Sequence, residues 1–452
     1  MATTSRKAPS PRGHLLLGSL RDFRLRPIGL FQEATQAHGD IVRFRFLHNT
    51  AHLIRHPDMI EHVLLTHQRN YTKQTPGIQK LQAILGQGLL TSDGDFWRRQ
   101  RRIAQPAFHR KRIAGFFAGM VSSTHRMLAR WNAQGDAPLD ISEEMMAVTF
   151  DAAGESLFSA DVGESAQRIS DALSTAMRIN TDRAWRAIRA PRWLPTAENR
   201  TFDAAMETLD TLVHSLIQSR RAAPGGHDDL LAMLVEARDD ETGEGMTDVQ
   251  LRDEVLTLLM AGHETTANAL TWTFHLVGTH PEVEERLLAE VDSVLGDRDP
   301  CLEDLPQMPW LNAVSQEAMR LYPPGWLFGR MPIEDDEIGG FHIPGQTLVM
   351  MSAFITHRHP DFWPDPERFD PERFLPEPGA KRHRFAHFPF GAGTRQCIGA
   401  AFASMEMSVI LAMAAQRYRL RMVPGFTPEV EPLVTLRARD GMPMQLQRRA
   451  GT

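Results

Sequence analysis

Cysteine is scarce in this chain, with only Cys301 and Cys397 among its 452 residues. Two cysteines cannot build the disulfide framework of a small secreted domain, and they fit a reducing compartment. We therefore expect a cytoplasmic protein. Long apolar runs are missing as well, because no stretch approaches the roughly 18 consecutive apolar residues that a membrane span needs. Residues 1–13 are mostly polar and contain proline and glycine. They predict a flexible tail rather than a signal peptide or an anchor.

A large excess of charge is also absent. The formal net charge is −6, so the composition gives no support for binding nucleic acid. Apolar residues make up 42% and charged residues 23% of the chain, as in an ordinary globular protein. By length alone the chain could hold two or three domains.

The spacing of apolar residues predicts many helices and few strands. A small β element is expected near the N-terminus, where residues 41–46 alternate and residues 51–55 pair back after a turn. Residues 70–95 lack clean periodicity, which predicts a long loop with at most a short helix. The turn-rich segment 356–387 contains His357 and His359, which we expect at the surface. The other expected elements are helices over 27–39, 247–280, 281–296 and 310–322, a helical stretch over 115–240 broken at 135–138, 191–195 and 224–226, and strands over 325–330, 341–355, 418–423 and 434–446.

Glycines surround one of the two cysteines. They stand six and four residues before Cys397 and two after it, with an arginine two before it and a phenylalanine seven before it. The apolar run that follows predicts a helix, whose dipole and free N–H groups would stabilise a thiolate at its N-terminus. A protein can offer sulfur to a haem iron in this way. A lone cysteine in such a turn is more often a small buried residue. Gln396 stands where a dinucleotide fingerprint needs glycine, so that motif is excluded.

The segment 247–280 is the longest helical pattern, and Thr247 with Gln250 predicts a capping box at its start. Inside it, Gly262 costs about 1 kcal/mol relative to alanine. Glu264 is a charged residue in apolar surroundings. The glycine and the charged residue each depart from the usual composition of such a helix, and two departures close together indicate a functional site. A zinc-protease motif would need histidine at 267, and alanine stands there. The alternative is a glutamate facing solvent, with Thr265 bonding back to the helix.

Basic residues cluster between residues 98 and 112. Trp97 and Arg101 are four residues apart and share a helix face. Arg98, Arg99, Arg102 and the 110–112 segment would remain outside and form a positive patch suited to an acidic partner. Nucleic acid is a weaker interpretation, because the patch is short and has few interleaved aromatic residues.

The motif Phe390-Gly391-x-Gly393-x-Arg395-x-Cys397-x-Gly399 closely resembles the haem-binding loop of the cytochrome P450 family. The resemblance extends across the chain in the family's order of motifs. It implies a mainly α fold with a smaller β portion, as one domain over residues 14–452 after a tail over 1–13. Haem b would lie between the 247–280 helix and the Cys397 loop. This replaces the two or three domains that length alone allows.

The resemblance also implies residue roles. Cys397 would be the iron ligand, Phe390 would pack beside its sulfur, and Glu264 with Thr265 would deliver protons. Ala261 and Gly262 would leave room for dioxygen. Further haem contacts would come from Trp97, Arg101, Arg330, Arg395 and Gly399. Glu317, Arg320 and Arg373 would form a buried structural network.

The implied activity is monooxygenation of an apolar small molecule with O2. Electrons would come from a separate ferredoxin and ferredoxin reductase docking at the basic patch, and we expect no fused reductase domain. Two alternatives stay open. A non-enzymatic haem-thiolate sensor or carrier would have no use for Glu264 and Thr265, and a peroxide-driven peroxygenase usually lacks that pair. The substrate could be a fatty acid, terpenoid, steroid or macrolide, although the 261–266 segment looks like the fatty-acid-hydroxylating branch. A monomer is assumed.

Overall fold

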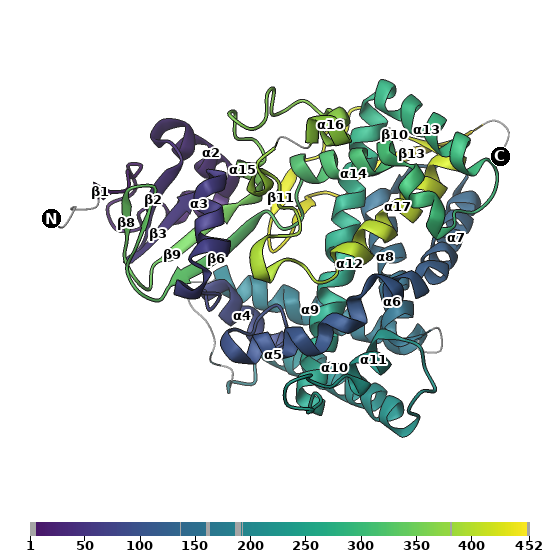
Figure 1. Cartoon of the computed structure of the whole chain (residues 1–452), viewed down its shortest axis with the longest axis horizontal. Coiled ribbons are helices and arrows are strands. Elements are labelled where there is room, and N and C mark those ends of the chain that lie inside the picture. The colour runs from purple at the N-terminus through teal and green to yellow at the C-terminus, as the bar shows by residue number, and fades with distance from the viewer. Residues whose placement is uncertain are drawn as a thin grey trace. The chain divides into compact units, whose positions relative to one another are not determined.

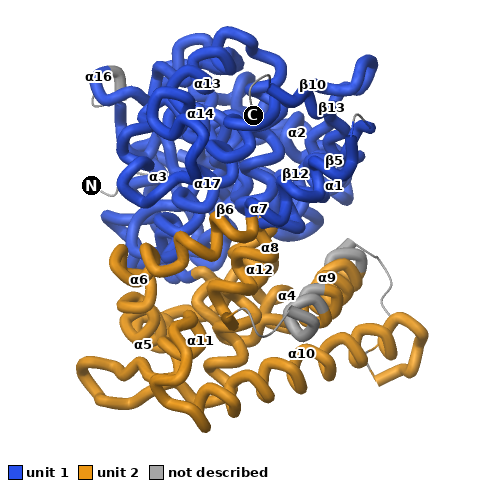
Figure 2. Tube along the Cα trace, turned by 90° about the vertical axis from the view of Figure 1, so that its right-hand side faces the viewer, with its two compact units in different colours: residues 1–72, 124–148, 265–452 blue, residues 73–123, 149–264 orange. Residues whose placement is uncertain are grey.

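The structure is a computed structural model that describes residues 6–135, 137–159, 163–185, 191, 193–379 and 382–449. It is mainly helical with small β-sheets, as predicted (Figure 1). The chain forms two compact units, drawn in two colours in Figure 2. Unit 1 holds residues 1–72, 124–148 and 265–452, and unit 2 holds residues 73–123 and 149–264. The single domain expected over 14–452 stays a prediction.

Unit 1 contains every strand of the described residues, and its largest sheet has the order β2-β3-β9-β6-β4. The expected N-terminal hairpin is present, with Ile41 opposite Ile54 in an antiparallel ladder. Val42 and Phe44 point into the core and pack against Phe31 of the adjacent helix. The strands of this sheet are β2 (Ile41–Phe46), β3 (Asn49–Ile54), β4 (Tyr71–Thr72), β6 (Leu327–Pro332) and β9 (Leu348–Ser352).

Three smaller sheets complete the β portion of unit 1. Their orders are β1-β8-β7, β10-β13-β5 and β11-β12. The strands are β1 (Arg6–Lys7), β5 (Leu139–Asp140), β7 (Asp336–Ile338), β8 (Phe341–Ile343), β10 (Tyr418–Met422), β11 (Val430–Pro432), β12 (Leu436–Ala438) and β13 (Pro443–Arg448).

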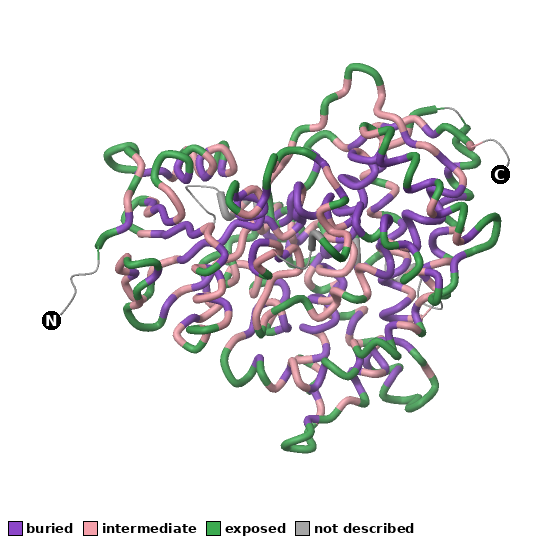
Figure 3. Tube along the Cα trace, turned by 45° about the horizontal axis from the view of Figure 1, so that its top comes forward, coloured by how far each residue is buried: buried purple, intermediate pink, exposed green. Residues whose placement is uncertain are grey.

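The helical core of unit 1 is built where α13, α14 and α17 pack together. The C-terminal two thirds of α17 are largely buried and form part of this core. Figure 3 colours the chain by burial class. The helices of unit 1 are α1 (Leu20–Leu25), α2 (Pro27–His38), α3 (Pro57–Glu61), α13 (Pro281–Leu295), α14 (Pro309–Leu321), α15 (Ala353–Thr356), α16 (Pro376–Gly379) and α17 (Ala400–Arg417).

Among its described residues, unit 2 consists of helices joined by loops and contains no strand. Its helices are α4 (Pro76–Leu85), α5 (Gly94–Ala104), α6 (Arg110–Gly115), α9 (Gly163–Trp185), α10 (Ala197–Ala222) and α11 (Leu230–Glu236). Three further helices contribute residues to both units, namely α7 (Phe117–Gln134), α8 (Ile141–Phe158) and α12 (Asp248–Thr279).

The two helices predicted over 247–280 and 281–296 begin and end close to the residues that the sequence indicated. Thr247 and Gln250 form the predicted capping box, because each side chain bonds the other's backbone amide, at 2.8 and 3.3 Å. Pro281 begins α13, and Gly296 ends it with a φ of 53°. The prediction over 341–355 was too long: the second strand ends at Ser352 and α15 follows. The helix breaks predicted at 135–138 and 191–195 lie partly outside the described residues.

The N-terminal segment packs onto unit 1 from Arg6 onward. β1 pairs with β8 in parallel, and Ala8 is buried in the core. The Pro9 carbonyl accepts a hydrogen bond of 2.7 Å from the Arg43 amide. The flexible tail predicted over 1–13 is therefore paired over part of its length, and residues 1–5 lie outside the described residues.

Candidate active site

The Cys397 loop is a tight turn in unit 1. The Cys397 amide donates to the Phe390 carbonyl across 2.9 Å, which closes the loop, and the Gly391 amide donates to Phe388 at the same distance. Gly391 and Gly393 have φ values of 68° and 70°, in the left-handed region that favours glycine. The predicted helix begins at Ala400, directly after this loop. Cys397 thus lies just before a helix N-terminus, as the glycine pattern predicted.

The surroundings of Cys397 fit a haem with a thiolate ligand. The Cys397 side chain is exposed and in no disulfide, and Ala401 beside it is exposed although α17 is buried from Met405 to Met407. A Cβ on Gly399 would lie 3.9 Å from the sulfur, so glycine keeps this surface clear. Among the described residues, no group of three or more His, Cys, Asp or Glu could hold a metal ion. An iron at Cys397 would therefore take its other ligands from a prosthetic group, as haem iron does.

A buried histidine, His357, and a half-buried one, His387, lie next to the loop. The Phe388 amide donates to Nε2 of His357 across 2.9 Å. Burial lowers the pKa of His357 well below its ordinary value and that of His387 to about 3, so both rings are neutral near pH 7. The surface position predicted for His357 and His359 is wrong, because both side chains are buried. His359 instead pairs with Asp40 at 3.0 Å. Spacing along a turn-rich segment carries no signal of such burial.

The segment of α12 that was predicted to face dioxygen, residues 261–265, is more exposed than the residues around it. Every residue from Ala261 to Thr265 is half-buried, whereas the neighbouring positions on both sides are almost all buried. Within unit 2, a Cβ on Gly262 would meet no atom closer than the Ala153 Cβ, at 3.8 Å. Packing within the protein therefore does not require glycine here. The position fits the close approach of a ligand, which is the other common reason for glycine in a helix.

One backbone carbonyl of this segment, that of His263, accepts a hydrogen bond from a neighbouring helix. The Thr149 hydroxyl of α8 donates to the His263 carbonyl across 3.1 Å, and both residues belong to unit 2. The His263 ring lies against Phe150 in an edge contact and is 2.6 Å from the Leu259 carbonyl. His263 therefore has a local structural role on α12, and Glu264 and Thr265 follow it along the chain.

The sequence analysis did not identify Glu406 of α17, an acid that is fully buried. Burial raises its pKa well above the ordinary value, and the nearby Thr266 hydroxyl offsets only part of that effect. Thr266 directly follows Thr265 on α12. The signal was available, because Glu406 interrupts the apolar run 400–415 just as Glu264 interrupts the apolar pattern of α12.

The predicted propionate-binding residues lie on regular elements. In unit 2, Trp97 is buried on α5 and Arg101 is half-buried one turn later. In unit 1, Arg330 is buried on β6 and donates to the Gly329 carbonyl at 2.8 Å, and Arg395 is half-buried in the cysteine loop. Arginines and an indole N–H are suitable donors for carboxylates.

Three arginines of the basic patch predicted for partner docking form ion pairs, and the docking role of the patch stays a prediction. Arg99 and Arg102 both bind Asp239, at 3.4 and 2.8 Å. Arg99 also pairs with Glu244 at 3.0 Å, and Arg102 pairs with Glu241 at 2.8 Å. Arg98 pairs with Asp95. The acidic loop 239–244, distant in sequence but in the same unit, therefore neutralises Arg99 and Arg102, which local sequence could not reveal.

The structural network is assembled in unit 1. Arg320 binds both carboxylate oxygens of Glu317, at 2.6 and 2.8 Å, and both side chains are fully buried. Arg373 lies 3.5 Å from the same carboxylate. Arg320 also donates to the carbonyls of His357, Pro366 and Arg368. The three residues thus tie the end of α14 to the segment that leads to the cysteine loop.

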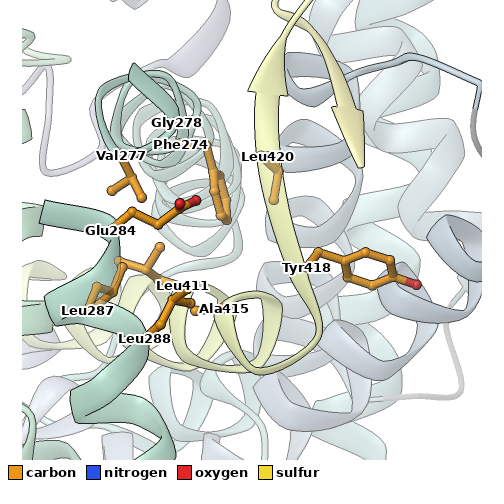
Figure 4. A pocket seen from close by; sticks show the side chains of 10 residues that line it. All are labelled: Phe274, Val277, Gly278, Glu284, Leu287, Leu288, Leu411, Ala415, Tyr418 and Leu420. Atoms are coloured by element: carbon orange, nitrogen blue, oxygen red, sulfur yellow. The ribbon is translucent and has the colours of Figure 1, made fainter. Parts of the chain in front are cut away.

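A small apolar cavity lies elsewhere in unit 1 (Figure 4). It measures about 20 Å³, and its lining includes Phe274, Leu411 and Leu420. That volume suits about one water molecule. None of the predicted site residues lines it. The cavity is therefore separate from the residues predicted to form the site.

Comparisons with known proteins agree with these observations. A family profile described as cytochrome P450 matches residues 8–442. Cyclooctat-9-en-7-ol 5-monooxygenase of Streptomyces melanosporofaciens is 40% identical over 91% of this chain and 89% of the relative. Cyclooctatin synthase of the same organism is 39% identical over 96% and 94% of the two chains. Pentalenene oxygenase of Streptomyces avermitilis is 33% identical over 87% of each chain.

The fold has a counterpart among solved structures. The crystal structure of the cytochrome P450DA heme domain superposes with a TM-score of 0.91 at 27% identity, covering 98% of each chain. No helix within the described part of the chain has the length and apolarity to cross a membrane. The family profile, the relatives and the fold agree, and the chain belongs to the cytochrome P450 family as a haem-thiolate monooxygenase.

Proposed function

We propose that this monooxygenase hydroxylates an apolar, polycyclic terpenoid. The observation that carries the proposal is the 40% identity over 91% of the chain to an enzyme named for cyclooctat-9-en-7-ol. Two further relatives are named for cyclooctatin and pentalenene. Among the substrates left open by the sequence, the terpenoid is therefore favoured over the fatty acid suggested by the 261–266 segment.

We further propose the roles of the site residues. Cys397 ligates the iron through its thiolate, and its position before α17 favours the charged sulfur. When bound, haem supplies the oxygen chemistry, and thiolate ligation favours O–O cleavage. Glu264 and Thr265 hold and pass protons, because a carboxyl and a hydroxyl are the two proton-carrying groups of the half-buried α12 segment apart from His263. Propionate contacts come from Trp97, Arg101, Arg330 and Arg395.

Electrons are proposed to come from a separate ferredoxin and its reductase. The ion pairs of Arg99 and Arg102 argue against the α5 surface as the docking site. A cytoplasmic location remains a prediction from the low cysteine content. A peroxide-driven reaction and a non-enzymatic haem sensor are alternatives that turnover measurements separate.

The test uses the purified holoenzyme with a surrogate ferredoxin and reductase. Cyclooctat-9-en-7-ol, pentalenene, lauric acid, a steroid and a macrolide are titrated, and the low-to-high-spin shift and the oxidised products are measured. We expect the largest shift and NADH-dependent product with a terpenoid. A shift and product with lauric acid alone would overturn the substrate class. Product formed only with added peroxide would favour the peroxygenase, and binding without any product would favour the sensor.

A further inference from the structure

An apolar turn near the N-terminus is unusually exposed. Leu15 and Leu16 expose 86% and 72% of their surface, the highest values for large apolar side chains in the described part of unit 1. Leu25 exposes 70%. Leu47 and Leu17 are partly exposed, at 43% and 37%. We call these five residues the leucine patch. Single exposed leucines are ordinary, but a cluster of them marks an interaction surface.

The leucine patch is displayed on a fixed backbone. The His14 and Gly18 backbones bond each other at 3.0 and 2.8 Å, and the Leu47 amide donates to Leu17 at 3.2 Å. The exposed Arg45 guanidinium donates to the carbonyls of His14, Leu15, Leu16 and Leu47 at 2.6–3.2 Å. These bonds hold the backbone of the turn against the strand that carries Arg45.

The geometry of Gly18 shows how closely the turn is seated. Its φ is 60°, and a Cβ there would lie 2.0 Å from the Arg45 carbonyl oxygen. No other residue fits this position without moving the strand. The turn is therefore a built feature of the fold rather than a loose end that happens to carry leucines.

Two members of the leucine patch line one groove. A groove of about 350 Å³ is lined by His14, Leu17, Gly18 and Leu25 together with Arg21, Asp22 and Arg26. Leu17 and Leu25 therefore share one concave surface. Leu47 joins it through its bond to Leu17.

Positive charge surrounds the leucines. Residues 6–26 carry six cationic side chains and one acidic one, whereas the whole chain has a net charge of −6. Arg12 and Arg21 are exposed, and Arg21 lines the groove. Arg26 is partly neutralised, because it pairs with Asp22 at 3.8 Å and with Glu33. Exposed leucines with arginines around them match an interface of acyl chains and anionic headgroups.

We propose that the leucine patch and the arginines around it form a lipid-facing surface that seats this protein peripherally on anionic membranes. A second copy of the chain fits less well, because five leucines expose only a few hundred Å², short of the roughly 800 Å² per partner of a stable interface. The leucines insert at the level of the headgroups, and the arginines contact lipid phosphates. This surface does not depend on the terpenoid assignment.

The test is flotation of the purified holoenzyme with vesicles. We expect binding to vesicles of phosphatidylcholine with 30% phosphatidylglycerol, and weaker binding to phosphatidylcholine alone. The double variant Leu15→Ser/Leu16→Ser should lower the partition coefficient roughly tenfold, because buried CH₂ groups drive insertion. The matched control, Ile333→Ser/Val434→Ser, changes two residues that expose 52% and 47% elsewhere in unit 1 and should bind as the wild type does.

Two further measurements make the outcomes decisive. Raising NaCl to 0.5 M should weaken binding, because screening shortens the reach of the arginines. The reduced-CO spectrum checks that each variant keeps its haem and fold. Equal flotation of the double variant and the wild type would overturn the proposal. The proposal would also be overturned if the wild-type protein bound no vesicles but formed a dimer, and the Leu15→Ser/Leu16→Ser variant did not form that dimer.

Discussion

Gly393 packs its α-carbon directly against the carbonyl oxygen of Leu64. A Cβ at this position would lie 2.0 Å from that oxygen, and the φ of Gly393 is 70°. The cysteine loop is thereby fixed onto the helical turn η1 (His62–Thr66) within unit 1. A glycine that the sequence motif marks as characteristic thus has a specific steric reason, which the motif alone did not give.

We expect Gly393→Ala to lower both stability and haem retention. The added methyl group must displace the Leu64 carbonyl, and the left-handed φ adds roughly 1 kcal/mol of strain. The thermal midpoint and the haem-to-protein ratio measure the two effects. Gly425→Ala is the matched control, because its φ is 81° but nothing lies within 4 Å of its Cβ position. If both variants lost the same stability and kept haem equally, the contact with Leu64 would have no role.

Cys397→Ala should abolish the absorption band of the reduced CO complex that reports a thiolate ligand. The sulfur is the proposed donor to iron, and an alanine methyl group cannot replace it. Cys301→Ala is the control, because Cys301 is also exposed and in no disulfide. Its spectrum should match the wild type. A normal band in the Cys397→Ala protein would reject the ligand assignment.

Thr265→Ala should keep haem but divert electrons to peroxide. We expect product per NADH to fall roughly tenfold or more, as for removal of a proton-transfer group. Thr271→Ala on the same helix is the control, since that hydroxyl bonds only its own helix at Ala267, 2.8 Å away. Peroxide release and product are measured together. Fully coupled turnover of Thr265→Ala would remove its proposed role in proton delivery.

Glu254 on α12 makes stability depend on pH. It is buried within unit 2, accepts a 3.0 Å bond from the Leu89 amide, and has its pKa raised by burial from 4.5 to about 8. Between these values the folded chain binds more protons than the unfolded chain, so stability falls as pH rises through that window. The loss is on the order of a few kcal/mol.

The variant Glu254→Gln should therefore flatten the dependence and be the more stable protein at pH 9, with little difference at pH 5. Thermal midpoints measured across pH 5–9 provide the comparison. Glu143→Gln, at an exposed position on α8, serves as the control and should follow the wild type. Parallel curves for Glu254→Gln and the wild type would show that the acid does not titrate as described.

The sequence predicted best those features that local chemistry determines. Thr247, Gln250, Pro281 and Gly296 carry their own start and stop signals, so α12 and α13 were placed to within about one residue. The cysteine loop was found because its glycines are spaced by backbone geometry. The second of the two strands predicted over 341–355 was extended too far, because α15 is only four residues long, too short for a helical period to show.

Ion pairs and burial that depend on residues distant in the sequence could not be predicted, for a physical reason. The arginines of α5 appeared as a solvated patch, because nothing in residues 98–102 reveals that Asp239 lies buried against them. His357 and Glu406 were missed in the same way, since burial is decided by elements far away in the chain. The sequence could propose which residues form the site, and these assignments stay predictions, but it could not predict their electrostatic surroundings.

The short half-buried stretch of α12 limits how much this helix can contribute to choosing a substrate. Five residues rising about 1.5 Å each span only about 7 Å. Ala261 and Gly262 have almost no side chain with which to contact a substrate. Discrimination between one carbon skeleton and another must then come from segments outside this stretch. Exchanging the stretch with that of a relative should leave regioselectivity with the recipient chain.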